Sequence, residues 1–234
     1  MDLIREETEL RTLALLGDAA MERLHRARVA VFGLGGVGGY TAETLARCGV
    51  GALDLIDNDE VAPSNINRQI IALHSTVGQK KTDVMAARVR DINPHATVRV
   101  HPVFYLPETA HLFDFSRYDY VVDAIDTVSG KMELVKRAKE AGVPIICSMG
   151  AGGKLDPCRF EVTDIYKTSV CPLAKVMRSL CRKNGIDSLK VVYSREESRA
   201  LPSAERTPAS MIFAPAAAGL AIAAEVVRDL AKLQ

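Results

Sequence analysis

Residues 28–69, RVAVFGLGGVGGYTAETLARCGVGALDLIDNDEVAPSNINRQ, decide the fold of this chain. The apolar run at 29–32 stops at Gly33, which is the pattern of a strand buried on both faces of a parallel sheet. The turn GLGGVG follows, and a second apolar run at 52–56 ends in Asp57. This order predicts a βαβ unit. We therefore expect a Rossmann-like, doubly wound α/β fold with a mostly parallel sheet and helices on both faces.

The glycine turn has the features of an anion site. Gly33 permits a tight turn, Gly35 and its neighbour Gly36 let a phosphate approach the backbone, and Gly38 lets the next helix pack closely on the strand. Unpaired N–H groups at the helix start, together with its dipole, favour an anion. Asp57 follows at roughly the twenty-residue interval at which an acidic side chain meets a ribose hydroxyl. The unit therefore predicts an adenine nucleotide site.

The segment that follows the second strand separates two classes of nucleotide protein. Glycine spacing alone fits both an NAD protein and an ATP enzyme. Residues 57–69, DNDEVAPSNINRQ, are polar, include three acidic residues and deliver an arginine to the carboxyl edge of the sheet. Arg68 can neutralise polyphosphate oxygens, and Asn65 can supply a directional hydrogen bond. This segment favours ATP, although an NAD-binding redox or sensing module stays as an alternative, as does an ion pair of Arg68 with a neighbouring acid.

Two further residues lie where contacts with phosphate are expected. Lys81 follows a glycine turn and can place its ammonium on phosphate as a point charge, whereas Lys80 would face elsewhere. Asp126 follows an apolar strand at 120–125, and ligands gather at the carboxyl ends of strands in open α/β sheets. We therefore predict Asp126 as the ligand of a Mg²⁺ ion held against ATP, and Asp123 as a brace of the loop.

Four stretches together resemble the E1-like adenylating enzymes, which activate a carboxylate as an acyl-adenylate: GLGGVG, LIDNDEVAPSNINRQ, GQKK and DAID. Within that superfamily the chain is similar, nearly end to end, to the bacterial tRNA threonylcarbamoyladenosine dehydratases. The stretches INRQIIALHSTVGQKK, DAIDTVSGK, SMGAGGKLDP and DIYKTSVCPLAKVMR carry this likeness. It implies an enzyme that uses ATP to activate the side-chain carboxylate of N6-threonylcarbamoyladenosine in tRNA and then closes that group into a ring.

The resemblance also implies a set of residues and partners. Catalysis would rest on Arg68, Lys81 and Asp126. The ATP site would comprise Gly33, Gly35, Gly36, Gly38, Asp57, Asp59, Asn65, Arg68, Gln69, Lys81 and Asp126. Relatives form homodimers in which an N-terminal arginine reaches the partner's nucleotide, and Arg11 is the matching position; its alternative is a solvated surface residue. A monovalent cation, Na⁺ or K⁺, near the crossover is also implied.

Cysteine spacing bears on the alternative function, adenylation of the C-terminal glycine of a ubiquitin-like sulfur carrier. E1-like enzymes of that kind usually hold a structural zinc with two Cys-x-x-Cys pairs, and this chain has no such pair, so we expect no structural zinc. Cys171 precedes an expected helix at 172–182, in the region where relatives carry a nucleophile or a persulfide. A catalytic or sulfur-relay role, with a cysteine desulfurase or sulfur acceptor as partner, is one hypothesis. Inert packing is the other.

Length and composition predict a single domain. The 234 residues, 48% hydrophobic and 25% charged, suit one domain with a sizeable core. We expect an N-terminal helical segment at 1–27, a nucleotide-binding core at 28–148, and a C-terminal extension at 149–234 with a crossover loop and the substrate side. The glycine-rich residues 149–157 would cross the sheet where a substrate enters.

Charge and cysteine usage bear on compartment and partners. The net charge of +1 neither demands nor excludes a nucleic-acid partner. Between residues 167 and 206, nine basic residues outnumber four acidic ones, which fits either a solvated helix face or an RNA footprint. No apolar run approaches the roughly 20 residues needed to span a bilayer, and the N-terminus is too charged for a secretory signal. With five cysteines lacking disulfide-like spacing, we expect a cytoplasmic protein.

Overall fold

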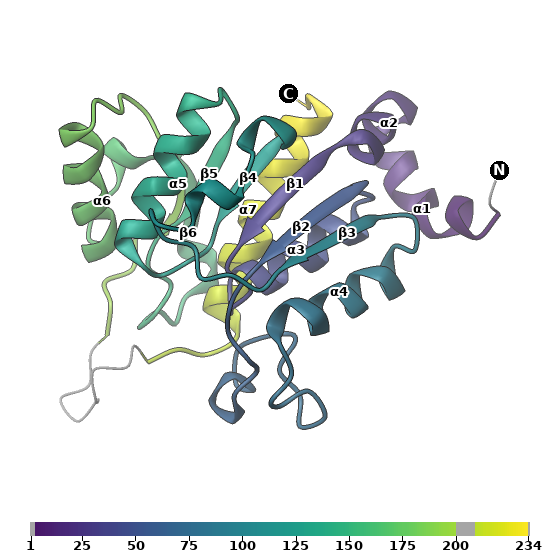
Figure 1. Ribbon diagram of the computed structural model, residues 1–234, viewed down its shortest axis with the longest axis horizontal. Coiled ribbons are helices and arrows are strands. Elements are labelled where there is room, and N and C mark those ends of the chain that lie inside the picture. Colours follow the sequence, from purple (N-terminus) through teal and green to yellow (C-terminus); the bar gives the residue numbers. More distant parts are fainter. Residues whose placement is uncertain (1–2, 200–208, 234) are drawn as a thin grey trace.

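The computed structural model describes residues 3–199 and 209–233 (Figure 1). Seven strands form one sheet in the order β3-β2-β1-β4-β5-β7-β6, in which only β6 runs antiparallel to its neighbour. The strands are β1 (Arg28–Phe32), β2 (Ala52–Ile56), β3 (Thr97–His101), β4 (Tyr120–Asp123), β5 (Ile145–Ser148), β6 (Phe160–Asp164) and β7 (Lys190–Ser194). The carboxyl ends of β1 and β4 meet where the strand order reverses, which is where ligands bind in such folds.

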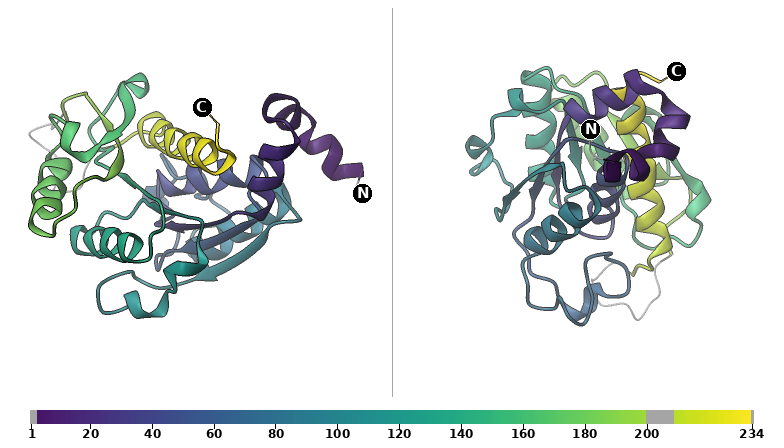
Figure 2. Two further views of the ribbon diagram at one scale, coloured as in Figure 1. Left: turned by 90° about the horizontal axis from the view of Figure 1, so that it is seen from above. Right: turned by 90° about the vertical axis from the view of Figure 1, so that its right-hand side faces the viewer.

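Helices cover both faces of the sheet (Figures 1 and 2). Val29 and Val31 of β1 join the core under α3, α4 and α7, and Ala30 and Phe32 join the core under α5 and α6. The helices are α1 (Leu3–Leu16), α2 (Asp18–Arg26), α3 (Gly38–Arg47), α4 (Lys81–Ile92), α5 (Val128–Glu140), α6 (Pro172–Lys183) and α7 (Phe213–Ala231). The predicted doubly wound fold is confirmed. No helix of the described residues is long and apolar enough to cross a membrane.

The glycine turn between β1 and α3 depends on two close backbone approaches. Gly33 has φ +88°, and a Cβ on it would lie 2.7 Å from the carbonyl oxygen of Ala124. A Cβ on Gly38 would lie 1.8 Å from the carbonyl oxygen of Gly33. Any side chain at either position would therefore force β1, α3 and the loop after β4 apart.

Three local expectations differ from the structure. Apolar residues at helical spacing over 6–26 predict one helix within the N-terminal segment, but Gly17, whose φ is +78°, breaks it into α1 and α2. The alternation of residues over 97–103 predicts a strand, but β3 ends at His101, because Pro102 has no N–H for the ladder. A short helix is expected over residues 107–113, and only the 3-10 helix Ala110–Leu112 forms there. The polar, proline-containing residues 195–208 predict a substrate loop or a disordered segment; the structure describes this stretch only as far as residue 199, so most of it lies outside the described residues.

A polar cluster crosses the face of β1, β2 and β3. Asp54 is buried and accepts hydrogen bonds from Arg28 Nε at 2.9 Å, His101 Nε2 at 3.0 Å and the Tyr118 hydroxyl at 3.4 Å. Burial alone would raise the pKa of the Asp54 carboxyl, but the hydrogen bonds and charges of His101 and Arg28 outweigh it, so the pKa lies below its usual 3.8. The ionised carboxylate therefore stabilises the folded state.

We predict that Asp54→Asn lowers the free energy of unfolding by about 2 kcal/mol at pH 7, since Arg28 and His101 lose their anion. Because the folded pKa is depressed, the contribution of Asp54 is complete above about pH 4 and is lost as pH falls below it. Urea unfolding at pH 7 and pH 3 should show the difference between variant and wild type shrinking at the lower pH. An equal difference at both pH values would contradict this assignment.

Candidate functional site

A pocket of about 840 Å³ opens at the carboxyl ends of β1, β2, β4 and β5. Its walls come from the glycine turn, the segment after β2, the start of α4, the loops after β4 and β5, and the start of α6. It brings together ten of the predicted site residues: Gly35, Gly36, Asp57, Asp59, Asn65, Arg68, Gln69, Lys81, Asp126 and Cys171. Gly33 and Gly38 shape the turn behind the pocket wall.

Asp57 fixes the glycine turn to the end of β2. Its Oδ2 accepts the Leu34 N–H at 2.7 Å, and its Oδ1 accepts the Asp59 N–H at 2.9 Å. Gly35 has open space before it, since a Cβ there would meet only the Gln69 amide at 3.8 Å. The backbone at Gly35 is therefore accessible to a phosphate, as the motif predicts.

Arg68 presents its positive charge without an anionic partner among the described residues. Its Nη1 donates to the carbonyl oxygen of Ser64 at 2.8 Å and to Asn67 Oδ1 at 2.9 Å. Both acceptors are neutral, so the alternative of an ion pair with Asp59 or Glu60 is wrong for this structure. The two bonds hold the guanidinium in place while leaving its charge for a bound anion.

Asn65 and Gln69 are buried beside Arg68, at the base of the same segment. Asn65 Oδ1 accepts the Ala62 N–H at 3.0 Å, which leaves its amide N–H groups for the pocket. Gln69 Oε1 is buried and has no hydrogen-bond partner among the described residues. An unpaired buried acceptor costs about 1–3 kcal/mol. A hydroxyl or amine of a nucleotide would remove that cost, so Gln69 fits the ligand expected here.

Lys81 begins α4 and is buried, with its Nζ 2.7 Å from Asp59 Oδ2. Its backbone N–H donates to the Asp59 carbonyl at 3.0 Å, so both ends of the lysine are tied to the same residue. The Asp59 side chain is mostly exposed, and Lys80 is exposed as expected. Because Asp59 lies in water, its attraction for Lys81 is screened, and a phosphate can compete for the ammonium.

Asp126 and Asp123 have different environments. Asp126 is exposed on the loop after β4 and lines the pocket, with the Thr127 hydroxyl 3.5 Å from its Oδ1. Asp123 is fully buried, and both of its oxygens lie 2.9 Å from Nζ of the equally buried Lys131. It also accepts the Ile125 N–H at 3.3 Å, so it braces the loop as expected. Sequence reasoning missed Lys131, which shares α5 with many solvated charges.

The site fits Mg²⁺ only in company with a nucleotide. Within the described residues, no group of three or more His, Cys, Asp or Glu side chains could hold a metal ion. Mg²⁺ commonly binds through one or two carboxylates together with phosphates and water. Asp126 offers one such carboxylate at the pocket, so it fits an ion delivered with ATP.

The ThiF family matches residues 7–233. The chain belongs to the ThiF family. A relative from Bacillus subtilis (strain 168), named tRNA threonylcarbamoyladenosine dehydratase, is 43% identical over 233 residues, which cover 93% of this chain and 92% of that one. A relative of the same name from Escherichia coli (strain K12) is 43% identical over 167 residues, covering 71% of this chain and 62% of that one.

Solved structures of the ThiF family agree with this placement. The structure of Escherichia coli tRNA N6-threonylcarbamoyladenosine dehydratase in complex with ATP has a TM-score of 0.90 and 34% identity, and covers 96% of this chain and 94% of that one. The same enzyme has been solved in complex with AMP, with the same TM-score. The resemblance to the dehydratases of the ThiF family is therefore confirmed.

The alternative function is represented by more distant relatives. The adenylyltransferase and sulfurtransferase UBA4 of Candida glabrata is 35% identical over 171 residues, which cover 70% of this chain but 39% of that protein. The dehydratases match more of both chains. Similarity within the ThiF family therefore favours the dehydratase over the activator of sulfur carriers.

The far end of the pocket, beyond β4, holds the predicted Cys171 and two residues that the sequence motifs did not single out, Ser148 and Lys154. Ser148 ends β5, and Lys154 follows in the crossover; both are buried and line the pocket. Cys171 is buried immediately before α6, and its Sγ would lie 3.5 Å from a Cβ on Gly150. Lys154 stands in the quoted stretch SMGAGGKLDP, where a lysine amid glycines was the available signal.

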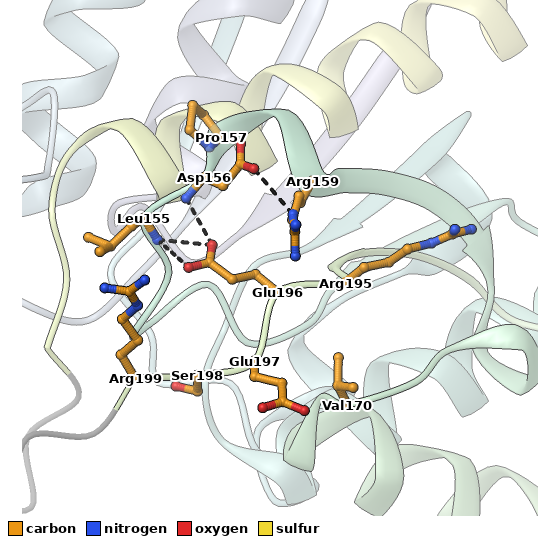
Figure 3. Close-up of a pocket in the computed structure, with 10 residues that line it drawn as sticks. All are labelled: Leu155, Asp156, Pro157, Arg159, Val170, Arg195, Glu196, Glu197, Ser198 and Arg199. Carbon is orange, nitrogen blue, oxygen red and sulfur yellow. Dashed lines mark hydrogen bonds and ion pairs between the residues drawn. The ribbon is translucent and has the colours of Figure 1, made fainter.

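A second hollow, of about 820 Å³, adjoins this end of the pocket, and Ser198 lines both (Figure 3). Glu196 lies at its centre, and its carboxylate accepts the N–H groups of Leu155 and Asp156 (Figure 3). Arg159 pairs with Asp156 at 3.2 Å. Glu196 therefore fastens the crossover loop to the segment after β7.

Arg11 does not line the pocket. It is exposed on α1, which extends away from the rest of the chain (Figure 2). Leu10 and Leu15 of the same helix are 61% and 82% exposed. Within one chain Arg11 is thus separate from the other predicted site residues, and its predicted role requires a second copy.

Proposed function

We propose that this protein uses ATP to activate the side-chain carboxylate of N6-threonylcarbamoyladenosine in tRNA and closes it to the cyclic form. One observation carries the proposal. The glycine turn, Arg68, Lys81 and Asp126 line a single pocket at the point where the strand order reverses, in a chain that resembles tRNA threonylcarbamoyladenosine dehydratases from end to end.

The chemistry proceeds in two steps. A carboxylate oxygen of the substrate attacks the α-phosphorus of ATP, forming an acyl-adenylate and releasing pyrophosphate. The carbamoyl group of the same substrate then attacks the activated carbonyl, closes the ring, and releases AMP with the original carboxylate oxygen. Because the nucleophile belongs to the substrate, the protein has to position groups and neutralise charge.

The pocket residues would divide these tasks. The backbone at Gly35 and Gly36 would face the phosphates, and Asp57 the ribose. Arg68 and Lys81 would stabilise the charge that develops around the α-phosphorus. Asp126 would hold Mg²⁺, which supplies further neutralisation of phosphate charge when bound. Asn65 and Gln69 would hydrogen-bond the nucleotide, with Asp59 holding Lys81 in place.

Nucleoside mass analysis tests the proposal directly. In tRNA from cells lacking the gene, the open form of the nucleoside should accumulate and the cyclic form disappear. An unchanged ratio of the two forms would rule the function out. Incubation with ATP and ubiquitin-like sulfur carriers, followed by a search for AMP-linked carrier, tests the alternative that the protein activates a sulfur carrier. Calorimetry with ATP and with NAD tests the alternative of an NAD-binding redox or sensing module.

Cys171→Ala tests whether the Cys171 thiol takes part in the reaction or only packs at the end of the pocket beyond β4. We expect the variant to keep dehydration within about threefold of wild type, because the reaction needs no protein nucleophile and the lost volume is small. Steady-state AMP release with modified tRNA is the measurement. A loss of several orders of magnitude would instead support covalent catalysis or sulfur relay through Cys171.

We further propose that two copies of the chain form a homodimer through α1. The support is the exposure of Leu10 and Leu15 on a helix that extends from the body, a position in which Arg11 could reach a partner's pocket. Sedimentation equilibrium would test this assembly, and a monomer at all accessible concentrations would refute it.

The remaining expectations from the sequence are part of the same proposal. We propose one adenylation domain over residues 1–234, supported by a single sheet that takes β6 and β7 from the C-terminal portion. The substrate would be tRNA, and the site of action the cytoplasm, in keeping with free cysteines at all five positions. A monovalent cation beside the crossover and a cysteine desulfurase or sulfur acceptor partner stay predictions.

A further inference from the structure

A buried lysine, Lys154, lies at the end of the pocket beyond β4 and has no role in the reaction described above. Lys154 lines the pocket and is only 3% exposed. Its ammonium donates to the carbonyl oxygen of Glu196 and is paired with no carboxylate among the described residues. The Glu196 carboxylate is close enough to feel this charge, but it accepts the N–H groups of Leu155 and Asp156 and forms no direct ion pair with Lys154.

The contact with the Glu196 carbonyl leaves the Lys154 ammonium only partly hydrogen-bonded. An ammonium carries three N–H donors, and one backbone carbonyl uses a single donor. A buried ammonium that is not directly bonded to an anion is costly in free energy. An anion that enters the pocket beside Lys154 would offset that cost.

The strand order indicates which anion this is. The residues expected to contact the nucleotide follow β1, β2 and β4, with Arg68 and Lys81 on the β2 side. Lys154 follows β5, which lies on the opposite side of β4 from β1. An acid that attacks the α-phosphorus in line must approach from the side away from the departing pyrophosphate. The substrate acid would therefore approach the α-phosphorus from the β5 side of the pocket, where Lys154 lies.

We propose that Lys154 binds the carboxylate of the tRNA substrate and holds it for attack on the α-phosphorus. The inference rests on the proposed function and adds the residue that recognises the reacting group. Before adenylation the ammonium compensates the charge of the carboxylate. It thereby distinguishes N6-threonylcarbamoyladenosine from an adenosine whose side chain ends in a neutral group.

The crossover loop does not depend on this ammonium for its shape. The Glu196 carboxylate accepts the Asp156 N–H at 2.8 Å and the Leu155 N–H at 3.0 Å (Figure 3). The Gly153 carbonyl accepts the Arg199 N–H at 2.9 Å, and the Gly152 carbonyl accepts the Ser198 hydroxyl at 3.2 Å. A neutral side chain of similar length at 154 should therefore leave the loop in place.

The test uses two anticodon stem-loop RNAs, one carrying N6-threonylcarbamoyladenosine and one carrying its neutral carboxamide. Dissociation constants are measured with a non-hydrolysable ATP analogue present, for wild type, Lys154→Met, Lys154→Arg and Lys139→Met. Lys139 is an exposed lysine in the last turn of α5 that does not line the pocket, and it is the matched control. Thermal unfolding of each variant shows whether the fold is kept.

Wild type and Lys139→Met should bind the carboxylate RNA about 10- to 100-fold more tightly than the carboxamide, the range for a hydrogen bond to a charged group. Lys154→Met should bind both RNAs alike, and Lys154→Arg should keep part of the preference. Affinity for the ATP analogue should be unchanged in every variant.

Three outcomes would overturn the inference. The first is that Lys154→Met keeps the wild-type preference for the carboxylate RNA, and the second is that wild type binds both RNAs alike. The third is that Lys154→Met loses affinity for the ATP analogue, which would assign the ammonium to nucleotide phosphates. Cyclisation of the carboxylate RNA by wild type is measured first. If cyclisation occurs and the preference is absent, only the inference fails; if cyclisation does not occur, the proposed function fails together with it.

Discussion

Arg68→Ala is expected to lower kcat/KM for dehydration of the modified tRNA by roughly 30- to 1000-fold. Removal of one electrostatic partner of a transition state costs about 2–4 kcal/mol, and each 1.36 kcal/mol is a factor of ten in rate. Arg68 bonds only neutral acceptors in the structure, so its charge is available to phosphate oxygens. AMP release under kcat/KM conditions measures the effect, and Asp126→Ala should show a loss of similar size.

Folding should survive both changes, because Arg68 is only partly buried and Asp126 is exposed. Arg68→Lys keeps the charge but loses the planar fork of donors, and should recover part of the activity. Arg137→Ala, an exposed arginine on α5 paired with Glu133, is the matched surface control. Full turnover in Arg68→Ala would remove Arg68 from the proposed site.

Lys131→Met is expected to lower the free energy of unfolding by about 3–5 kcal/mol, the cost of leaving one member of a buried ion pair without its partner. Lys131 and Asp123 are both fully buried, 2.9 Å apart, beneath the loop that presents Asp126. Urea unfolding at pH 7 is the measurement. Activity should fall as well, because Asp123 also holds the Ile125 N–H in that loop.

A double variant separates charge from shape. In Lys131→Met with Asp123→Leu no unpaired charge is left in the core, so the loss of stability should be well below the sum of the two single losses. Arg137→Met, which breaks the exposed pair with Glu133 on the same helix, should be close to neutral. Additive losses in the double variant would show that Lys131 and Asp123 act independently.

Local patterns in the sequence predicted the strands and most of the pocket. The run at 52–56 became β2 without a change of boundary, because apolar residues between turn residues specify strands locally. The segment 57–69 predicted that Arg68 lies in the pocket, and the glycine turn before Lys81 predicted the same of Lys81. Gly17 was missed as a helix break, because a single glycine is tolerated within many helices.

Contacts between distant parts of the chain could not be predicted in this way. Lys154 meets Glu196 across 42 positions, and no local pattern links the two. Two of the basic residues at 167–206 also have acidic partners elsewhere in the chain, which the local charge count did not indicate. Lys190 pairs with Glu225 and Asp229 of α7, and Arg195 pairs with Glu161. Such pairs become visible only when the sheet brings the segments together.

The order of the strands has a consequence for how this fold acquires new substrates. Every pocket residue expected to face the phosphates lies before position 127, whereas the wall around Ser148, Lys154 and Cys171 comes from later in the chain. Exchange of residues 149–183 alone would change the wall that faces the substrate acid and keep the residues that face the phosphates. Helix α7 would have to stay, because Pro215 lies beside Gly36 of the glycine turn and the Gly219 carbonyl accepts the Thr41 hydroxyl of α3.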